Sequence, residues 1–255
     1  MPYIPNTNQE REEMLGEIGA KDFQDLFGNI PADIRLKRAL DIEGGLTEQD
    51  LDERIKEKGS WNRPAAEGSC FLGGGTWDHS WPAVVDQLSG RTEFLTAYTP
   101  YQPECSQGTL QCIFEFQSMM AELCGMDVAN ASMYDGASAC AEALLLATST
   151  TRRKRVVVSK GLHPDARATI QTYLRYQNIE VVEAPLRNGV TDWNGSVDSQ
   201  TAAVLVQQPN FLGNVEALDP VAASCQETGA LAVASINPIA LGLLRSPGHA
   251  GFDIV

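Results

Sequence analysis

The chain has 255 residues, of which 43% are hydrophobic and 20% are charged, enough for one sizeable core with an appendage. Its formal net charge of −14 argues against nucleic acid and anionic membrane surfaces as partners. The six cysteines form no CxxC pair and no apolar run approaches the length of a membrane span, so we expect a reduced, soluble, cytoplasmic protein.

The N-terminal region is highly charged and is predicted to form short helices. TNQEREEMLGEIG begins with Thr7 as the N-cap and has Glu10 three residues later, which is a capping-box pattern. TEQDLDERIKEKG repeats the design with Thr47 as the cap. Because apolar residues are too sparse here for an independent core, we expect a helical arm over 1–60 and one large domain over 61–255. The arm could pack on that domain, on another chain or on sequence outside this chain.

From Gly108 onward the pattern changes to long helices and then to alternating strands and helices. The predicted helices span 108–126, 138–150, 164–178 and 219–229, the last with Asp219 as its cap. The predicted strands span 155–160, 179–185, 202–210, 230–237 and 252–255. Continuous apolar strands that alternate with helices predict an α/β fold with a mostly parallel sheet covered on both faces. The last strand runs into the chain end, so we expect this chain to be part of a longer one.

Polar side chains follow several predicted strands at the end where ligands bind in open α/β sheets. The candidates are His163, Gln207, Gln208, Asn210, Asn214, Ser235 and Asn237. Loops at these ends are polar in most α/β proteins, so a binding site and an ordinary polar edge both remain open.

The segment MYDGASACAEALLL places Gly136 at a turn before a helix. Ala137, Ser138 and Ala139 then offer backbone N–H groups and a hydroxyl at the positive end of that helix, which could cradle a phosphate. The alternative is an ordinary helix cap made by an Asp or Ser side chain.

Other motifs for nucleotides, metals and nucleophiles are missing from the sequence. LGGGTWDH lacks the ending of a phosphate loop, and His79, His163 and His249 are far apart in sequence, so no metal site is expected. Lys160 follows a predicted strand, but it precedes the turn at His163 and is a poor candidate for bonding a cofactor aldehyde.

The segment YTPYQPECSQG fits no helix or strand period and is stiffened by Pro100 and Pro103. It is either a surface loop or the wall of a pocket. Its polar and aromatic candidates are Tyr98, Tyr101, Glu104, Ser106 and Gln107.

Together these segments resemble a known family. GTWDHSWPAVV, FLTAYTPYQPECSQGTLQC, HPDARATIQTYL, VQQPNFLGNVE and INPIALGLLRSPGHAGFDIV are similar to the glycine decarboxylase (P-protein) family, in the subunit 1 form of its split members. The resemblance covers essentially the whole chain. It implies a fold type I pyridoxal phosphate (PLP) transferase-like large domain, and an α2β2 assembly in which subunit 2 carries the Schiff-base lysine and PLP.

On this resemblance the chain is a degenerate copy of the cofactor-binding fold, with no catalytic residue of its own. Gly136 and Ser138 would correspond to a phosphate cradle, His163 to a residue stacked on the pyridine ring, and Asn210 to part of the same pocket. Asn237 stands where catalytic members have an aspartate that keeps the ring nitrogen protonated, so the electron sink would be weakened. No cofactor is therefore expected on this chain.

The resemblance also implies roles for the proline-stiffened segment and for the assembly. Tyr98, Tyr101, Glu104, Ser106 and Gln107 would line the partner subunit's site or contact substrate. With subunit 2, the chain would decarboxylate glycine and transfer the aminomethyl group to the lipoyl arm of H-protein, as an oxidoreductase active only in the complex. The alternatives are an independent PLP enzyme, such as an aminotransferase or desulfurase-like protein, and a non-catalytic scaffold for the partner.

Overall fold

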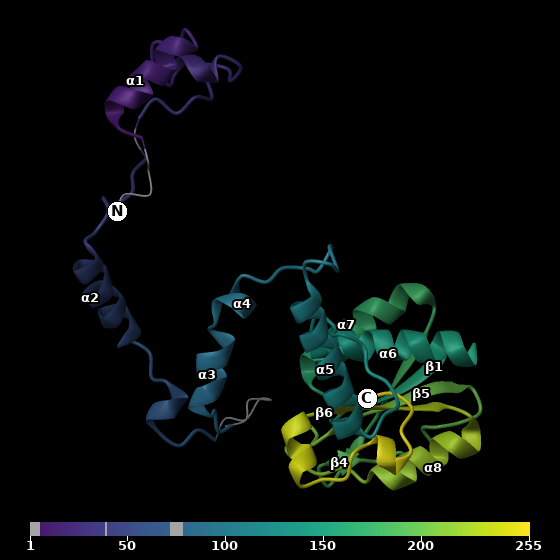
Figure 1. The fold of residues 1–255 in the computed structure, drawn as a ribbon. Coiled ribbons are helices and arrows are strands. Elements are labelled where there is room, and N and C mark those ends of the chain that lie inside the picture. The colour runs from purple at the N-terminus through teal and green to yellow at the C-terminus, as the bar shows by residue number, and fades with distance from the viewer. Residues whose placement is uncertain (1–5, 39, 72–78) are drawn as a thin grey trace. The chain divides into compact units, whose positions relative to one another are not determined.

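The computed structural model describes residues 6–38, 40–71 and 79–255. These residues fall into two compact units, Met1–Ser69 and Cys70–Val255 (Figure 1).

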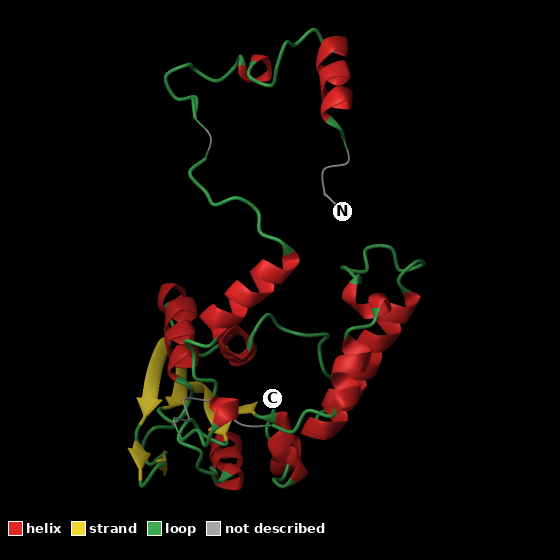
Figure 2. Cartoon of the chain, turned by 90° about the vertical axis from the view of Figure 1, so that its left-hand side faces the viewer, coloured by secondary structure: helices red, strands yellow, loops and turns green. Residues whose placement is uncertain are grey.

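The first unit contains two α-helices joined by a long stretch with little regular structure (Figure 2). They are α1 (Asn8–Glu17) and α2 (Glu48–Gly59), and neither contains a buried residue. The capping box at α1 is confirmed: the Thr7 hydroxyl accepts from the Glu10 N–H at 3.2 Å, and the Glu10 carboxylate accepts from the Thr7 N–H at 2.6 Å. Thr47 caps α2 in the predicted way. Local capping chemistry therefore defines these helices, and tertiary burial contributes little.

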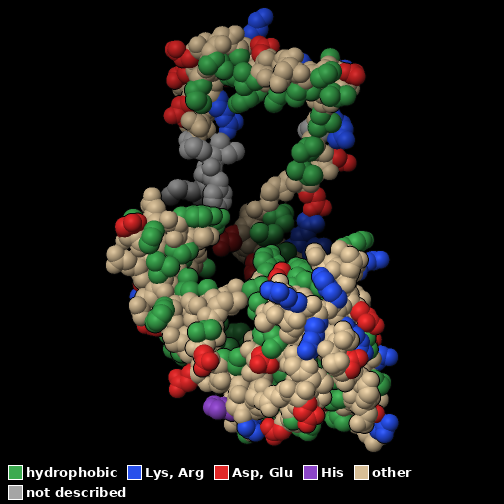
Figure 3. Space-filling view, turned by 90° about the vertical axis from the view of Figure 1, so that its right-hand side faces the viewer, with side chains coloured by type: hydrophobic (Ala, Val, Ile, Leu, Met, Phe, Trp, Pro, Cys, Tyr) green, Lys and Arg blue, Asp and Glu red, His purple; other side chains and the backbone are tan. Residues whose placement is uncertain are grey.

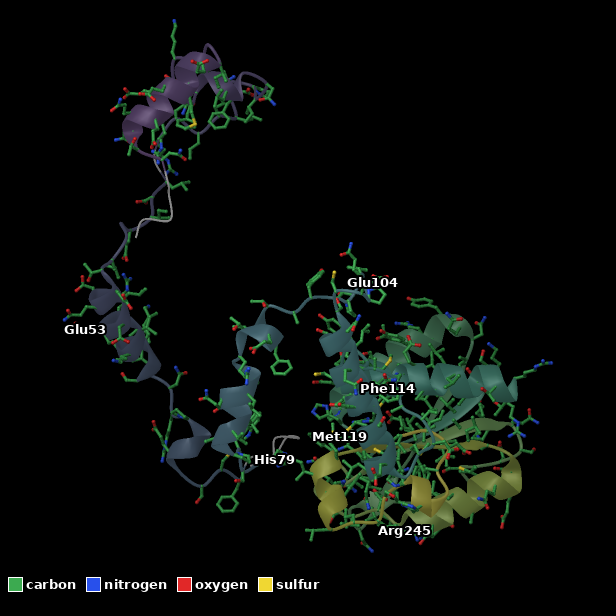
Figure 4. All side chains as sticks on the ribbon, viewed as in Figure 1. Glu53, His79, Glu104, Phe114, Met119 and Arg245 are labelled. Atoms are coloured by element: carbon green, nitrogen blue, oxygen red, sulfur yellow. The ribbon has the colours of Figure 1, made fainter. Side chains whose placement is uncertain are left out.

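The second unit begins with short helices and one long one. They are α3 (Ala83–Ser89), α4 (Thr92–Leu95) and α5 (Gln107–Cys124). Helix α5 ends at Gly125, whose φ of 71° lies in the left-handed region that favours glycine. Of the residues of α5, Cys124 alone is buried, while Phe114 and Met119 are exposed along the helix (Figure 4).

A parallel sheet forms the centre of the second unit, with the order β2-β1-β5-β6. Its strands are β1 (Arg155–Ser159), β2 (Glu180–Ala184), β5 (Thr201–Gln208) and β6 (Leu231–Ile236). A small antiparallel pair, β3 (Leu186–Arg187) and β4 (Val190–Thr191), lies between β2 and β5 in the chain. Beyond β6, Ile254 forms a parallel bridge with Val233, which is where the sequence predicted a further strand. The predicted α/β class is thus confirmed.

Helices cover both faces of this sheet. Helices α6 (Gly136–Thr151) and α7 (Pro164–Leu174) lie on one face and α8 (Leu218–Thr228) on the other, above and below the strands in Figure 1. Side chains alternate along each strand: Val156 packs with the α6–α7 core and Val157 with the α8 core. Both kinds of position must therefore be apolar, which is why the strands are continuous hydrophobic runs.

The start of α8 differs from the prediction. The helix begins at Leu218 with Ala217 as N-cap and no side-chain capping bond, so Asp219 as the cap was wrong. The Asp219 carboxylate instead accepts a hydrogen bond from Arg245 at 2.7 Å. Pro220 still lies in the first turn, where a missing N–H costs no helical hydrogen bond.

The surface carries charges of both signs. On the face shown in Figure 3, acidic and basic side chains are interspersed. Within the described ranges, no helix is both long enough and apolar enough to span a membrane.

The packing of α6 on the sheet gives a direct stability test. Leu144 is 0% exposed in the core and Leu146, two residues later on the same helix, is 58% exposed. We expect Leu144→Ala to lower the free energy of unfolding by about 2–5 kcal/mol because it leaves a cavity. Leu146→Ala should change it by less than about 0.5 kcal/mol. Urea denaturation followed by circular dichroism measures both, and equal losses would contradict the assigned faces of α6.

Candidate binding site at the carboxyl edge of the sheet

The parallel register brings the ends of three strands to one edge of the sheet. Gln207 of β5 lies beside Ser235 of β6, and Gln208 lies beside Ile236. β1 runs parallel to β5 on the other side and ends at Ser159. The residues that follow these strands therefore meet at the same edge, where ligands bind in open α/β sheets.

A cavity of about 370 Å³ opens at this edge, within the size range of small-molecule sites. It is lined by Asp135, Gly136 and Ala137 at the start of α6, by His163, Asp165 and Ala166 at the start of α7, and by Gln207, Ser235, Ile236 and Asn237 at the strand ends. Three of the residues predicted for a degenerate cofactor pocket, Gly136, His163 and Asn237, lie together here. Ser138 and Asn210 are not among the lining residues.

The start of α6 is capped by the protein's own carboxylate. Asp135 Oδ1 accepts from the backbone N–H of Ser138 at 2.7 Å and from the Ser138 hydroxyl at 3.0 Å. These hydrogen bonds lower the pKa of Asp135, because they stabilise its charged form. Of the two interpretations that the sequence left open, the structure has the ordinary cap. An anion already occupies donors that a phosphate would need.

His163 is held from three directions. Its backbone N–H donates to Gln207 Oε1 at 2.8 Å, and its ring Nδ1 accepts from the backbone N–H of Asp165 at 3.1 Å. The ring of Phe211 meets the imidazole edge-on, with centroids 5.0 Å apart. The imidazole therefore presents a positioned flat ring at the cavity. The sequence did not indicate the contact with Phe211.

Asn237 is oriented by a backbone donor. Its Oδ1 accepts from the N–H of Ile239 at 3.1 Å, and its own backbone N–H donates to the carbonyl of Gln208 at 3.2 Å. With the oxygen engaged, the side chain is left to offer its NH₂ group. This is a hydrogen-bond donor at a position where the resemblance would place a carboxylate acceptor in catalytic members.

A buried thiol lies near the cavity. Cys140 of α6 is 7% exposed, and burial raises the pKa of its thiol. The nearby Ser235 hydroxyl acts in the opposite direction, and the charge of Asp135 raises the pKa further. The thiol is thus kept protonated and behaves as a small apolar group.

Asn210 belongs to a buried network behind the loop that carries Phe211. Its Nδ2 donates to Glu216 Oε1 at 2.8 Å, and its Oδ1 accepts from the N–H groups of Leu212 and Asn214, both at 3.0 Å. Glu216 is 4% exposed and also accepts from the backbone and hydroxyl of Thr191. Asn210 is therefore fully engaged in holding the loop. Sequence reasoning missed Glu216, because a single acidic residue in a loop gives no sign of burial.

The described residues that line this cavity include none from the proline-stiffened segment. Tyr98 and Tyr101 are 82% and 80% exposed, with ring centroids 6.4 Å apart. Ser106 lines a second cavity of about 630 Å³ beside α4 and α5. Glu104 lies just before α5 and is exposed, as is Gln107 (Figure 4). The two groups of candidates thus do not share a cavity.

Two other sequence features are outside the site. LGGGTWDH lies, apart from His79, outside the described residues. Lys160 is exposed and is not among the residues that line the cavity.

The second unit has a parallel sheet between two helical layers. A helix start, the imidazole ring of His163 and the amide of Asn237 lie together at the carboxyl edge of this sheet. This arrangement indicates the class of protein. It is the large-domain architecture of fold type I PLP-dependent transferases. The chain belongs to the glycine cleavage system P-protein family, whose model matches residues 1–255. The resemblance found in the sequence is thereby confirmed.

Relatives and solved structures agree with this assignment. The chain is 48% identical to a probable glycine dehydrogenase (decarboxylating) subunit 1 of Desulforamulus reducens, and 49% identical to one of Bacillus pumilus. The matches cover 100% and 99% of this chain but 58% and 57% of the relatives. The chain therefore spans less than two thirds of the length of these curated relatives.

Among solved structures, an inhibitor-bound glycine decarboxylase (P-protein) of the glycine cleavage system matches with a TM-score of 0.86 and 46% identity. That match covers 99% of this chain and 57% of the other. A sphingosine-1-phosphate lyase of Burkholderia pseudomallei matches with a TM-score of 0.55 at 15% identity, which shows a shared fold alone.

The P-protein family is PLP-dependent, but the residues of this cavity do not fit PLP. The Asp135 carboxylate takes the N–H and hydroxyl of Ser138 at the helix start. Asn237 presents an amide where a protonated pyridine nitrogen would need an acceptor. None of the described residues that line the cavity is a lysine or an arginine.

The cap at α6 predicts a pH-dependent stability. Asp135→Ala removes the acceptor for Ser138, so the variant should be less stable than the parent at neutral pH. The pKa of Asp135 is lowered from its ordinary value of 3.8, so its stabilisation is present above that value and is lost as the pH falls through the folded-state pKa. The difference between parent and variant should shrink on acidification, as measured by urea denaturation from pH 7 downward.

Asp165→Ala is the control for the loss of a carboxylate at a helix start. Asp165 lies in the first turn of α7 and lines the same cavity, but α7 is capped by the ring of His163 instead. We expect a smaller loss of stability. A deficit of Asp135→Ala that stays constant at every pH would contradict the capping role.

Proposed function

We propose that this chain is the subunit 1 part of a glycine decarboxylase and that PLP is held by a partner subunit. The assembled enzyme would decarboxylate glycine and pass the aminomethyl group to the lipoyl arm of H-protein. Support comes from the family match over residues 1–255 and from relatives named as subunit 1 of glycine dehydrogenase (decarboxylating). An α2β2 assembly in the cytoplasm is part of the same proposal.

The proposal that PLP is held by the partner and not by this chain rests on the chemistry of the sheet-edge cavity. Its helix start is filled by Asp135, and Asn237 offers a donor where the cofactor ring would need an acceptor. Both features argue that this chain does not hold PLP, and that the electron sink for decarboxylation is supplied elsewhere in the complex. The same features argue against an independent PLP enzyme.

We further propose that the segment before α5 forms a wall of the partner's site. Pro100 and Pro103 restrict the backbone, and helix α5 anchors one end of the segment. Tyr98 and Tyr101 present rigid rings with hydroxyl tips that are more than three-quarters exposed. Glu104, Ser106 and Gln107 extend the polar surface of the same segment. Exposed aromatic side chains of this kind suit a surface that another chain covers.

The helical arm has a proposed role in assembly. We infer that residues 1–60 pack mainly on another chain, with 61–255 as the large domain. None of the residues of α1 and α2 is buried, and apolar side chains such as Ile18, Leu51 and Ile55 are 49–65% exposed. Such side chains gain free energy only when a partner removes them from water.

The division of labour is tested by measuring PLP on each chain. The purified chain, mixed with PLP and then dialysed, should retain no protein-bound cofactor absorbance, whereas its complex with the partner subunit should. Glycine-dependent release of carbon dioxide should require both chains and lipoylated H-protein. Cofactor that stays bound to the isolated chain through one of its lysines would overturn the proposal.

The wall role predicts a selective loss of turnover. We expect Tyr98→Phe and Tyr101→Phe to lower kcat of the assembled complex by about 10-fold to 100-fold, because each loses an oriented hydroxyl at the reacting group. Assembly and PLP content should be unchanged. Steady-state kinetics with H-protein, together with sedimentation and cofactor absorbance, give the three readouts.

Tyr176→Phe is a matched control, because Tyr176 is also 80% exposed but lies beyond α7, outside the segment. It should leave turnover unchanged. If Tyr98→Phe and Tyr101→Phe both keep full activity, or fail solely because the subunits no longer associate, the segment is structural and the chain acts as a scaffold.

A further inference from the structure

Two amide side chains in the sheet-edge cavity are fixed in one orientation by backbone donors. Gln207 Oε1 accepts the N–H of His163 at 2.8 Å, and Asn237 Oδ1 accepts the N–H of Ile239 at 3.1 Å. A backbone N–H can bond the oxygen of an amide but not its nitrogen, so neither side chain can be flipped without losing this bond. Both therefore present their NH₂ groups to the remaining space.

The NH₂ group of Gln207 faces the cavity. Gln207 is 7% exposed, it lines the cavity, and its Nε2 has no hydrogen-bond partner among the described residues. Among the described residues, Nε of Arg167 is the only buried side-chain nitrogen or oxygen without a hydrogen-bond partner. The unpaired Nε2 of Gln207 is therefore not fully buried. The small accessible surface of Gln207 thus lies toward the cavity. This donor is therefore free to bond an acceptor atom of a molecule that enters the cavity.

The cavity also offers flat and apolar surfaces. The imidazole of His163 is held by Asp165 and by the edge of Phe211, so its orientation is preset. Ala137, Ala166 and Ile236 line other parts of the wall. A planar ring can stack on the imidazole while these apolar groups contact its edges.

The charges of the cavity select against anions. Asp135 and Asp165 line it, and none of the described lining residues is basic. Asp135 is kept as a carboxylate by its hydrogen bonds from Ser138. A phosphate or carboxylate ligand would lie beside these like charges, with no lysine or arginine among the described lining residues to offset them.

We propose that this cavity binds a small, planar, uncharged molecule that accepts hydrogen bonds, such as an aromatic nitrogen heterocycle with a carboxamide, and that it rejects phosphorylated and carboxylate analogues. The NH₂ groups of Gln207 and Asn237 are the donors, and the imidazole of His163 is the stacking surface. This inference does not depend on the proposed function, because the binding concerns this chain alone and needs neither a partner subunit nor glycine.

The probes are nicotinamide and nicotinate, which share a ring and differ in charge. Saturation-transfer NMR and chemical-shift titration of the whole 255-residue chain, up to about 10 mM probe, measure the two dissociation constants. We expect nicotinamide to bind and to shift the ring resonances of His163, which a His163→Gln sample identifies. Nicotinate should bind at least about 10-fold more weakly.

Two nearly isosteric variants test the donors. Gln207→Glu and Asn237→Asp keep the oxygen that accepts the N–H of His163 or Ile239, and each replaces the NH₂ group by a charged oxygen. Each should weaken nicotinamide binding at least about 10-fold, because a donor becomes an acceptor. Gln200→Glu makes the same chemical change at an exposed position outside the cavity and should alter the dissociation constant by less than about 2-fold.

Unfolding curves of all three variants show whether the fold is retained. If Gln207→Glu or Asn237→Asp does not fold, the parent chain with the two probes still decides the charge selectivity. The proposal is overturned if nicotinamide fails to bind at about 10 mM, if nicotinate or PLP binds as tightly, or if both folded variants bind nicotinamide like the parent.

Discussion

The register of the central strand β5 is the constraint on which the rest of the second unit depends. All eight residues from Thr201 to Gln208 are buried, and β5 pairs in parallel with β1 on one side and β6 on the other. A slip by one residue would exchange the two faces and move Val204 and Leu205 into the wrong cores. The strand is thus locked, and its last residues are carried to a defined place at the carboxyl edge.

At the carboxyl edge of the sheet, hydrogen bonds between polar groups hold the loops that follow the strands, whereas apolar packing holds the strands themselves. Gln207 accepts the N–H of His163, so the end of β5 holds the turn that follows β1. Glu216 collects donors from Thr191 and Asn210 and so holds the loop that follows β5. These hydrogen bonds fix the two loops relative to the strand ends, because buried polar contacts of this kind restrict the backbone to one arrangement.

The same fold can therefore present opposite hydrogen-bonding chemistry at one edge. A carboxylate cap at α6 and an amide at Asn237 remove the features that a phosphorylated pyridine would need, while the sheet and the helices stay intact. Cofactor fit depends on a few side chains at the strand ends, whereas the fold depends on the apolar layers behind them. Under the proposed function, this subunit would keep its shape for assembly while its partner performs the chemistry.

The sequence by itself determined the four strands of the parallel sheet, the approximate positions of the longer helices and the family, because apolar periodicity, capping residues and long motifs are local signals. It correctly indicated which edge of the sheet carries polar groups. Only the tertiary structure decided that Asp135 caps the helix start, that Asn210 is buried against Glu216, and that backbone N–H groups engage the side-chain oxygens of Gln207 and Asn237. The partner of Gln207 is 44 residues away in the chain and is brought near only by folding. The other three partners are close in the chain, but the sequence pattern shows neither which polar groups pair nor which of them are buried.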